Sequence, residues 1–273
     1  MIEGLANARF VILDVETTGL SSRHGDKIIE VAAVKCEGLR VTDRFESLIN
    51  PQRPLSYGAY QVNRISPEML KDAPLAADVL PQVFRFMQGS CVVGHNIKFD
   101  LGFLRHELSL TGLSLPGDVP SLDTCQMARG LLPGLSGYSL REVAYAVGLE
   151  SFQQHRAMAD VEMTYEVFRA LLQTAERHDL FSLPLLMRIF GPSCGRNPLP
   201  QDLVPLIQEA IDTSRPLELI YSGITGQGIT LRTVTPRQLV RDKQQVLLVA
   251  YCHLRQEERR FRLDRILWAK NNQ

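Results

Sequence analysis

The alternation of apolar strand-like segments with helical segments constrains the fold of this chain more than any other feature. Residues 8–15 form a short apolar run, and the strand-like runs 27–38 and 39–50 meet at a glycine-containing hairpin turn. Short apolar runs at 91–96 and 120–124 then alternate with segments of helical spacing. Strands that alternate with helices after an initial meander predict an α/β domain with a mixed sheet.

Three expected helices begin with capping signals. Ser66 stands before Pro67, a pair that favours a helix start. Asp123 precedes another helical segment as a candidate cap. Ser139 has Glu142 three residues later, which is the pattern of a capping box.

Acidic side chains follow the apolar strands. Asp14 and Glu16 end the first strand, and side chains two apart on a strand point the same way, so both converge on one spot. Such strand ends are where open α/β sheets place their sites. Asp100 enters a helix just after a second strand, and the sequence HRAMAD places His155 five residues before Asp160. Five residues turn about 500° on a helix, so we expect His155 on the loop and Asp160 on the helix.

Four carboxylates in one cleft need cations between them. Asp14, Glu16, Asp100 and Asp160 would otherwise repel one another strongly. All-oxygen ligands suit Mg²⁺ or Mn²⁺ rather than zinc, and two such ions roughly 4 Å apart serve in-line displacement at phosphorus. An imidazole has a reference pKa of about 6.5, so His155 is a candidate to take the proton from the attacking water.

The segments LDVETTGL, HNIKFDLGFL and HRAMAD resemble the three motifs of the DEDDh family of 3′–5′ exonucleases, to which the proofreading ε subunit of bacterial DNA polymerase III belongs. ISPEML, LDT and YSLREVAYAVGL resemble its connecting segments, so the resemblance covers about residues 8–175. It implies a ribonuclease H-like mixed sheet flanked by helices. It also implies two metal ions, with His155 as general base and as ligands Asp14, Glu16, Asp100 and Asp160.

The same resemblance implies a set of substrate-binding residues. They are Thr17, Thr18, Gly19, Ile65, Asn96 and Phe99. The first three would hold the terminal nucleotide by backbone and hydroxyl contacts, and the others would shape its pocket. Relatives often have His-Gly-Ile where this chain has Asn63-Arg64-Ile65, which keeps the stacking residue. Glu30, inside a strand-like run, is expected at an edge or on the surface rather than in the site.

Residues 201–273 resemble a WYL domain, a small SH3-like β-barrel found on bacterial regulators. One helix precedes at least four strand-like runs, although Val246-Leu247-Leu248 replaces the Trp-Tyr-Leu that names the domain. The resemblance implies nucleic-acid or nucleotide binding by the arginines Arg232, Arg260, Arg262 and Arg265. Arginine forks suit phosphate, and Arg260, Arg262 and Asp264 are expected in a row on one strand face.

The charge distribution separates the two parts. Residues 1–180 carry 17 Lys and Arg against 22 Asp and Glu, a net charge of −5. Residues 181–273 carry 13 against 8, a net charge of +5. Compositional drift or two modules with different electrostatic roles would both give this split. We expect an exonuclease domain over 1–178, a linker over 179–200 and a WYL-like domain over 201–273.

The proline-rich segment 181–200 offers a further hint about partners. Residues 177–186, RHDLFSLPLL, resemble the short peptides that dock into bacterial sliding clamps, but without their glutamine. A sliding clamp or a polymerase subunit is therefore a possible partner. The alternative is an apolar connector that packs against either domain.

Composition limits the remaining classes. No apolar run approaches the roughly 18 residues of a membrane span, and the N-terminal residues show no signal segment. The five cysteines are scattered and form no C-x-x-C pair, which indicates reduced thiols in a cytoplasm. We therefore expect a cytoplasmic enzyme that releases nucleoside monophosphates from the 3′ ends of single-stranded DNA in replication or repair. Two alternatives stay open: an exonuclease of RNA or short oligoribonucleotides, and a ligand-sensing regulator with a nuclease-like domain.

Overall fold

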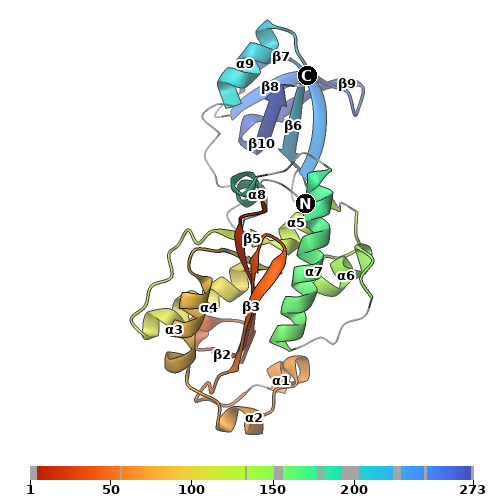
Figure 1. Cartoon of the computed structure of the whole chain (residues 1–273). Coiled ribbons are helices and arrows are strands. Elements are labelled where there is room, and N and C mark those ends of the chain that lie inside the picture. The colour runs from red at the N-terminus through yellow and green to blue at the C-terminus, as the bar shows by residue number, and fades with distance from the viewer. Residues whose placement is uncertain are drawn as a thin grey trace.

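A computed structural model describes most of the chain, namely residues 5–55, 57–132, 134–150, 156–177, 180, 182–191, 203–223, 229–242 and 245–271. The first sheet has the strand order β3-β2-β1-β4-β5. Its strands are β1 (Arg9–Thr17), β2 (Ile28–Glu37), β3 (Arg40–Leu48), β4 (Cys91–Gly94) and β5 (Ser121–Asp123). β1 pairs antiparallel with β2 and parallel with β4, so the expected mixed sheet and hairpin are confirmed (Figure 1).

Strand β1 is buried on both faces because its apolar side chains alternate between two cores. Phe10 and Ile12 belong to one cluster, together with the buried faces of α5, α7 and α8. Val11, Leu13 and Val15 belong to the other cluster, with α3 and α4. Burying one such side chain contributes about 1.5–3 kcal/mol, so the central place of β1 follows from its unbroken apolar run.

The helices of this part begin where the capping signals predict. Ser66 accepts the Met69 N–H, Asp123 accepts the N–H groups of the next helix, and Ser139 with Glu142 forms a full capping box. The helices are α1 (Tyr57–Asn63), α2 (Pro67–Lys71), α3 (Ala76–Met87), α4 (Lys98–Leu110), α5 (Thr124–Leu131), α6 (Leu140–Ala146), α7 (Ala157–Glu176) and α8 (Leu183–Phe190). No helix in these ranges is long and apolar enough to cross a membrane.

The C-terminal part is a five-stranded antiparallel sheet with one helix packed on it. The strand order is β10-β6-β7-β8-β9, and across the described residues no pairing joins the edge strands β9 and β10. The described residues therefore show an antiparallel sheet, and its closure into an SH3-like barrel stays a prediction. Its elements are α9 (Leu203–Asp212), β6 (Leu217–Ser222), β7 (Ile229–Asp242), β8 (Gln245–Cys252), β9 (Glu257–Arg262) and β10 (Ile266–Asn271).

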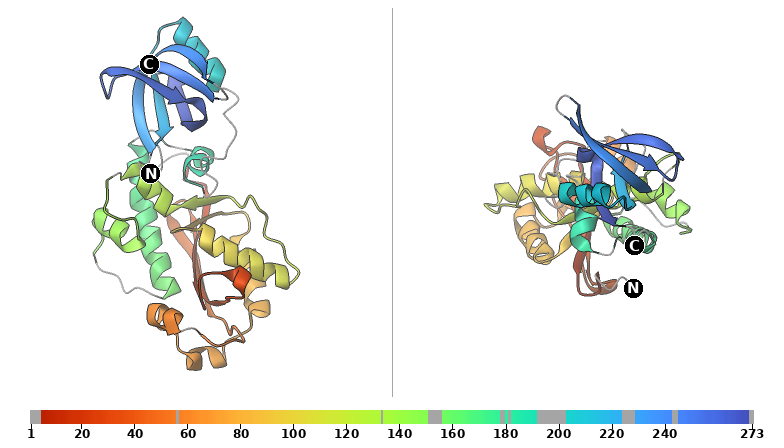
Figure 2. Two further views of the ribbon diagram at one scale, coloured as in Figure 1. Left: turned by 180° about the vertical axis from the view of Figure 1, so that it is seen from behind. Right: turned by 90° about the horizontal axis from the view of Figure 1, so that it is seen from above.

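The expected linker contains helix α8, which is part of the first core. Leu186, Ile189 and Phe190 are fully buried against it, because helical spacing gathers these apolar side chains on one face. Arg188 donates a hydrogen bond to the carbonyl of Leu267 in β10, and Leu267 itself packs into the first core. Helix α8 therefore joins the two parts, as the view from behind also shows (Figure 2). Of the clamp-like segment, the described side chains of Leu180, Leu183, Leu185 and Leu186 pack in this core.

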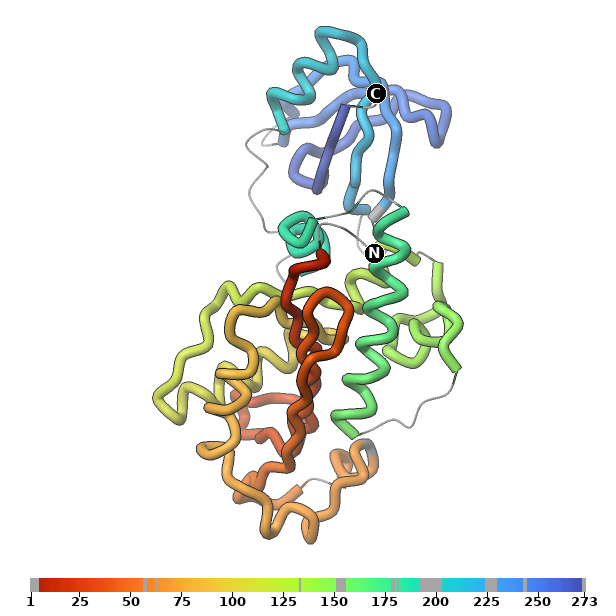
Figure 3. Tube along the Cα trace, in the orientation of Figure 1, coloured from red at the N-terminus to blue at the C-terminus, as the bar shows by residue number. Residues whose placement is uncertain are grey.

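The C-terminal sheet lies at the end of the first sheet where β1, β4 and β5 begin. Met187 of α8 lines a hollow with Arg9 and Cys91, the first residues of β1 and β4. A Cβ on Gly191, just after α8, would lie 3.2 Å from the carbonyl oxygen of Ser121, so the end of α8 lies against the first residue of β5. The trace shows α7 running along the sheet from the opposite end towards the C-terminal part (Figure 3). The carboxyl ends of β1, β4 and β5 therefore face away from the C-terminal sheet.

Candidate active site

Three carboxylates meet at the carboxyl end of β1. One oxygen each of Asp14, Glu16 and Asp160 lies within 4.8 Å of the others. Asp14 and Glu16 point to the same side of β1, and Asp160 stands in the first turn of α7. The strand and the helix are brought together by the core under α7, since Val161 and Ala157 are fully buried there.

Asp100 lies next to this group from helix α4. Its side chain is only 4% exposed, and its Oδ1 accepts the Val15 N–H at 3.1 Å, between Asp14 and Glu16. Asp100 is outside the 4.8 Å group. Its charge nevertheless acts on Asp14, so the four acids predicted from the sequence share one electrostatic environment.

Burial and mutual repulsion hold protons on these acids. Burial raises the pKa of Asp14 well above its usual range, and the charges of Asp100, Glu16 and Asp160 raise it further. Burial, followed by the charges of Asp160 and Glu30, raises the pKa of Glu16 to about 7. Burial also raises the pKa of Asp100 to about 8, against the opposite effect of the Val15 N–H. A divalent cation would replace these protons, and carboxylate oxygens are the ligands that Mg²⁺ and Mn²⁺ prefer. The donor set therefore fits the expected metals.

His155 lies outside the described residues, but Arg156 beside it is held firmly. Its guanidinium donates to Glu30 through Nε at 3.0 and 3.2 Å and through Nη2 at 2.6 Å. The expectation of an edge or surface place for Glu30 is wrong, since its side chain is completely buried. The physical reason is that β2 is an interior strand with α7 packed over it.

The turn after β1 is organised by Asp26, which the sequence reading did not single out. The Thr17 hydroxyl donates to the Gly19 carbonyl at 2.6 Å, and the Thr18 hydroxyl accepts the Lys27 N–H at 3.0 Å. A side chain on Gly19 would collide with the carboxylate of Asp26. That carboxylate also accepts the Ser21 N–H, at 3.1 Å. The close approach explains why glycine stands at this position.

The other predicted substrate residues are distributed around the site. Ile65 is fully buried in a small cluster with Ile29 and Leu70, so its side chain contacts protein in this conformation. Phe99 is half-buried and packs against Phe103 with ring centroids 4.9 Å apart. Asn96 is exposed in a left-handed conformation with φ of 67°. The roles of these residues in binding remain predictions.

His95 and Asp123 stabilise the carboxyl ends of β4 and β5 through hydrogen bonds. His95 makes hydrogen bonds to the Thr124 hydroxyl at 2.9 Å and to the Tyr138 carbonyl at 2.8 Å. Burial lowers the pKa of His95. Asp123 accepts the N–H groups of Asn96 and Cys125 and caps α5, as the sequence predicted. Both side chains therefore make hydrogen bonds within the protein.

The four C-terminal arginines differ in how they are held. Arg262 forms a two-pronged ion pair with Asp264 at 3.0 and 2.6 Å, whereas Arg260 is exposed. Arg232 donates to the Thr230 hydroxyl at 3.1 Å, and Arg265 is half-buried. The expected row including Asp264 is wrong, because β9 ends at Arg262 and the chain turns there.

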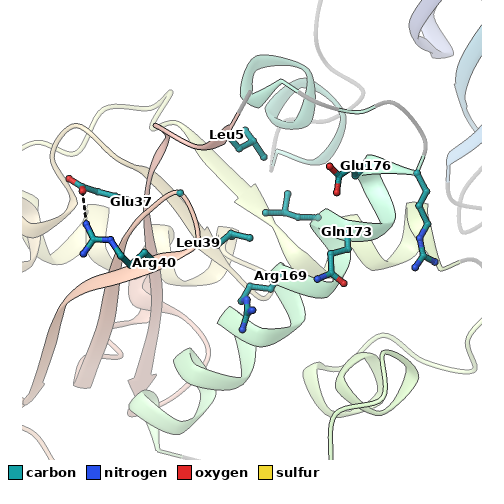
Figure 4. Close-up of a pocket in the computed structure, with 10 residues that line it drawn as sticks. Leu5, Glu37, Leu39, Arg40, Arg169, Gln173 and Glu176 are labelled. Carbon is teal, nitrogen blue, oxygen red and sulfur yellow. Dashed lines mark hydrogen bonds and ion pairs between the residues drawn. The ribbon is translucent and has the colours of Figure 1, made fainter. Parts of the chain in front are cut away.

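A surface hollow of about 830 Å³ lies away from the carboxylates. Leu5, the hairpin turn from Glu37 to Arg40 and the end of α7 surround it, and Glu37 pairs there with Arg40 (Figure 4). None of the four acids lines it. We therefore assign the candidate active site from the arrangement of its side chains and not from this hollow.

Comparison with known proteins agrees with this arrangement. The family model described as Exonuclease (RNase_T) matches residues 11–168, and that of the WYL domain matches residues 202–270. This chain belongs to the exonuclease family. The resemblances to a 3′–5′ exonuclease and to a WYL domain are confirmed.

Curated relatives match mainly the exonuclease part of this family member. The 3′-5′ exonuclease DinG of Bacillus subtilis is 39% identical over 181 residues, which are 66% of this chain and 19% of DinG. DNA polymerase III PolC-type of Halalkalibacterium halodurans is 30% identical over 252 residues, 91% of this chain and 17% of that protein. The chain thus spans less than a fifth of the length of these relatives.

Solved structures share the fold. Exonuclease X in complex with 5′ overhanging duplex DNA matches with a TM-score of 0.50 and 27% identity, over 61% of this chain and 93% of that one. E. coli Exonuclease I in complex with a dA16 oligonucleotide matches with a TM-score of 0.59 and 18% identity, over 89% of this chain and 55% of that one. That 89% exceeds the part matched by the exonuclease model, so the structural likeness extends into the C-terminal part.

Proposed function

We propose that the chain is a metal-dependent 3′–5′ exonuclease that removes nucleoside monophosphates from single-stranded DNA ends. The meeting of Asp14, Glu16 and Asp160 within 4.8 Å in a member of the exonuclease family carries the proposal. Asp100, tied to Val15 through one oxygen, has its second oxygen for a cation. The relatives named for 3′-5′ exonuclease activity and the DNA in two related structures add support.

Each residue has a defined part in the reaction. Asp14, Glu16, Asp100 and Asp160 would hold two Mg²⁺ or Mn²⁺ ions, which supply charge stabilisation at the scissile phosphate and an activated water. His155 would accept the proton of that water. Thr17, Thr18 and Gly19 would position the terminal nucleotide at the end of β1, where the backbone of this turn is fixed by Asp26. Ile65, Asn96 and Phe99 would complete the pocket.

The basic C-terminal domain, residues 201–273, would hold the strand rather than cleave it. Its sheet lies beyond the carboxyl end of α7, and Asp160 and Glu176 are 16 residues apart on that helix. At about 1.5 Å per residue this separation is about 24 Å, so only a longer strand reaches both. An SH3-like barrel fold of this domain, a polymerase partner and a sliding clamp are part of the same hypothesis. A clamp would have to displace the buried side chains of α8.

The test is digestion of a 5′-labelled single strand with Mg²⁺ or with EDTA. A circular strand of the same sequence is the control, since it has no 3′ end, and an RNA of the same sequence tests the alternative substrate. We expect progressive shortening of the linear DNA with Mg²⁺ only and an intact circle. Cleavage of the circle, or no Mg²⁺-dependent shortening of any strand, would refute the proposal. Faster digestion of RNA would move the substrate class to RNA.

A further inference from the structure

Glu30, which is completely buried, forms an ion pair with Arg156 beside the carboxylate group. The Glu30 side chain has no exposure, and its partner guanidinium is 43% exposed. Three nitrogen–oxygen contacts of 2.6 to 3.2 Å join them. The second carboxylate oxygen of Glu30 also accepts the Ala157 N–H at 2.9 Å. One carboxylate thus binds both a side chain and a backbone group, 126 and 127 residues away in the sequence.

The pair lies between β2 and the first turn of α7. Ala157 is the first residue of α7, and the Arg156 carbonyl accepts the Asp160 N–H at 3.1 Å. Free N–H groups at a helix start need an acceptor, and the acceptor of the Ala157 N–H is Glu30 of strand β2. Glu30 therefore contacts the same helical turn that carries Asp160.

Glu30 also stands opposite Glu16 in the sheet. The two residues are Cα partners on β1 and β2, so their side chains share a face. Like charges opposite each other are destabilising, and Arg156 is the cation that acts on both. Without Glu30, the guanidinium of Arg156 would be left beside Glu16 and would compete with a metal ion for its oxygens.

We propose that Glu30 is a positioning residue, which holds Arg156 and the start of α7 so that Asp160 meets Asp14 and Glu16 in a geometry that binds metal. The proposal rests on the nuclease function proposed above. It assigns to a buried strand residue a role that neither its place in the strand nor the acidic motifs indicate. Partners of this kind typically change metal affinity or activity by about 10- to 100-fold when altered.

The test uses the full chain with Glu30→Gln and Arg156→Lys, and with Glu162→Gln as the matched control. Glu162 lies on α7 and forms an exposed ion pair with Arg44 of β3 at 4.0 Å, so it reports on loss of an acid from another ion pair between α7 and the sheet. The readouts are kcat and KM on a labelled single strand, Mn²⁺ binding measured by calorimetry without substrate, and the melting temperature.

We expect Glu30→Gln to lower kcat and weaken Mn²⁺ binding by about 10- to 100-fold, with KM nearly unchanged. Arg156→Lys keeps the charge but loses the fork, so a smaller loss in the same direction is expected. In Glu30→Gln/Arg156→Met, Mn²⁺ binding should recover in part, because the competing cation is gone. Glu162→Gln should match the unaltered chain in all readouts.

A purely structural role would lower the melting temperature but leave kcat per folded molecule and Mn²⁺ binding unchanged, and that result would overturn the proposal. If Glu30→Gln does not fold, the Arg156→Lys variant tests the proposal instead. The Arg156 side chain is partly exposed, so we expect its substitution to leave the protein folded. Unchanged kcat and Mn²⁺ binding in Arg156→Lys would then overturn it. If the unaltered chain digests no strand, the proposed function fails, but the Mn²⁺ comparison still decides the role of Glu30.

Discussion

The backbone N–H of Val15 donates a 3.1 Å hydrogen bond to Oδ1 of Asp100. The bond joins β1 to the first turn of α4, and it does so at the residue between Asp14 and Glu16. It occupies one oxygen of Asp100 and leaves Oδ2 for a cation. The strand that carries two of the acids therefore also orients a third.

We predict that the metal-free protein loses stability as the pH rises. The folded state raises the pKa of Glu16 to about 7 and that of Asp100 to about 8, above the ordinary values of 4.5 and 3.8. The folded protein therefore binds more protons than the unfolded chain between these values. The stabilisation is complete below about pH 4 and is lost as the pH rises to about 8. In EDTA, the melting temperature should fall by roughly 5–10 °C between pH 5.5 and pH 8.5.

Two further measurements check whether the clustered acids cause this fall of the melting temperature with pH. Mn²⁺ should restore most of the lost melting temperature at pH 8.5, because a cation replaces the protons. Asp14→Asn should flatten the slope, since it removes one charge from the group. A melting temperature that rises with pH in EDTA would contradict the prediction.

Single substitutions of the acids should separate activity from folding. We expect Asp14→Ala, Glu16→Ala, Asp100→Ala and Asp160→Ala each to abolish Mg²⁺-dependent hydrolysis while the chain stays folded. The reason is that each removes a metal ligand, and the repulsion among the remaining acids falls. Circular dichroism and digestion of a labelled strand give the two readouts. Substantial Mg²⁺-dependent activity of Asp14→Ala would mean that the site is assigned wrongly.

His155→Ala should remove the proton acceptor but leave strand binding intact. We expect turnover to fall by roughly 10²- to 10⁴-fold. At saturating Mg²⁺ the rate of the unaltered chain should climb with pH through the imidazole range, about 6.5, and then level off. The measurement is a pH–rate profile for both proteins, with strand affinity as the control. The same profile in His155→Ala would assign the proton to another group.

Arg260 and Arg262 should differ in their contribution to strand binding, since Asp264 holds only Arg262. In the inactive Asp14→Ala background, Arg260→Ala should reduce the slope of log K against log salt by about 0.7, the value for one phosphate on a single strand. Arg262→Ala should change it less, and Asp264→Asn should steepen it by freeing the guanidinium. We use point substitutions rather than removal of the C-terminal part, because α8 packs in the first core and is hydrogen-bonded to β10. Identical slopes in all variants would show that this edge does not touch the strand.

His95→Phe should cost stability rather than chemistry. The change removes the hydrogen bonds that the ring makes with the Thr124 hydroxyl and the Tyr138 carbonyl, which costs about 1–3 kcal/mol. Urea unfolding measures this loss. The kcat per folded molecule should stay within about twofold, since both ring nitrogens already bind the protein. A large drop in kcat with unchanged stability would place His95 in the reaction.

The secondary-structure elements and the chemical character of the site could be predicted from the amino-acid sequence. Short apolar runs predicted the strands, and capping residues such as Ser66 and Ser139 predicted helix starts, because both signals arise from neighbours in the chain. Asp14 and Glu16 were predicted to converge because two residues on one strand face the same side. Asp160, from α7, joins them in the structure.

Which distant groups share one environment became clear from the packed fold. Glu30 has the local pattern of a strand residue, and its burial against Arg156 depends on packing between elements 126 residues apart. The same holds for the bond from Val15 to Asp100 and for the place of α8 in the core. The local pattern of apolar and polar residues predicts the secondary structure of a segment. The pKa of a carboxylate and the anchoring of a helix depend instead on which surfaces meet when the segments pack.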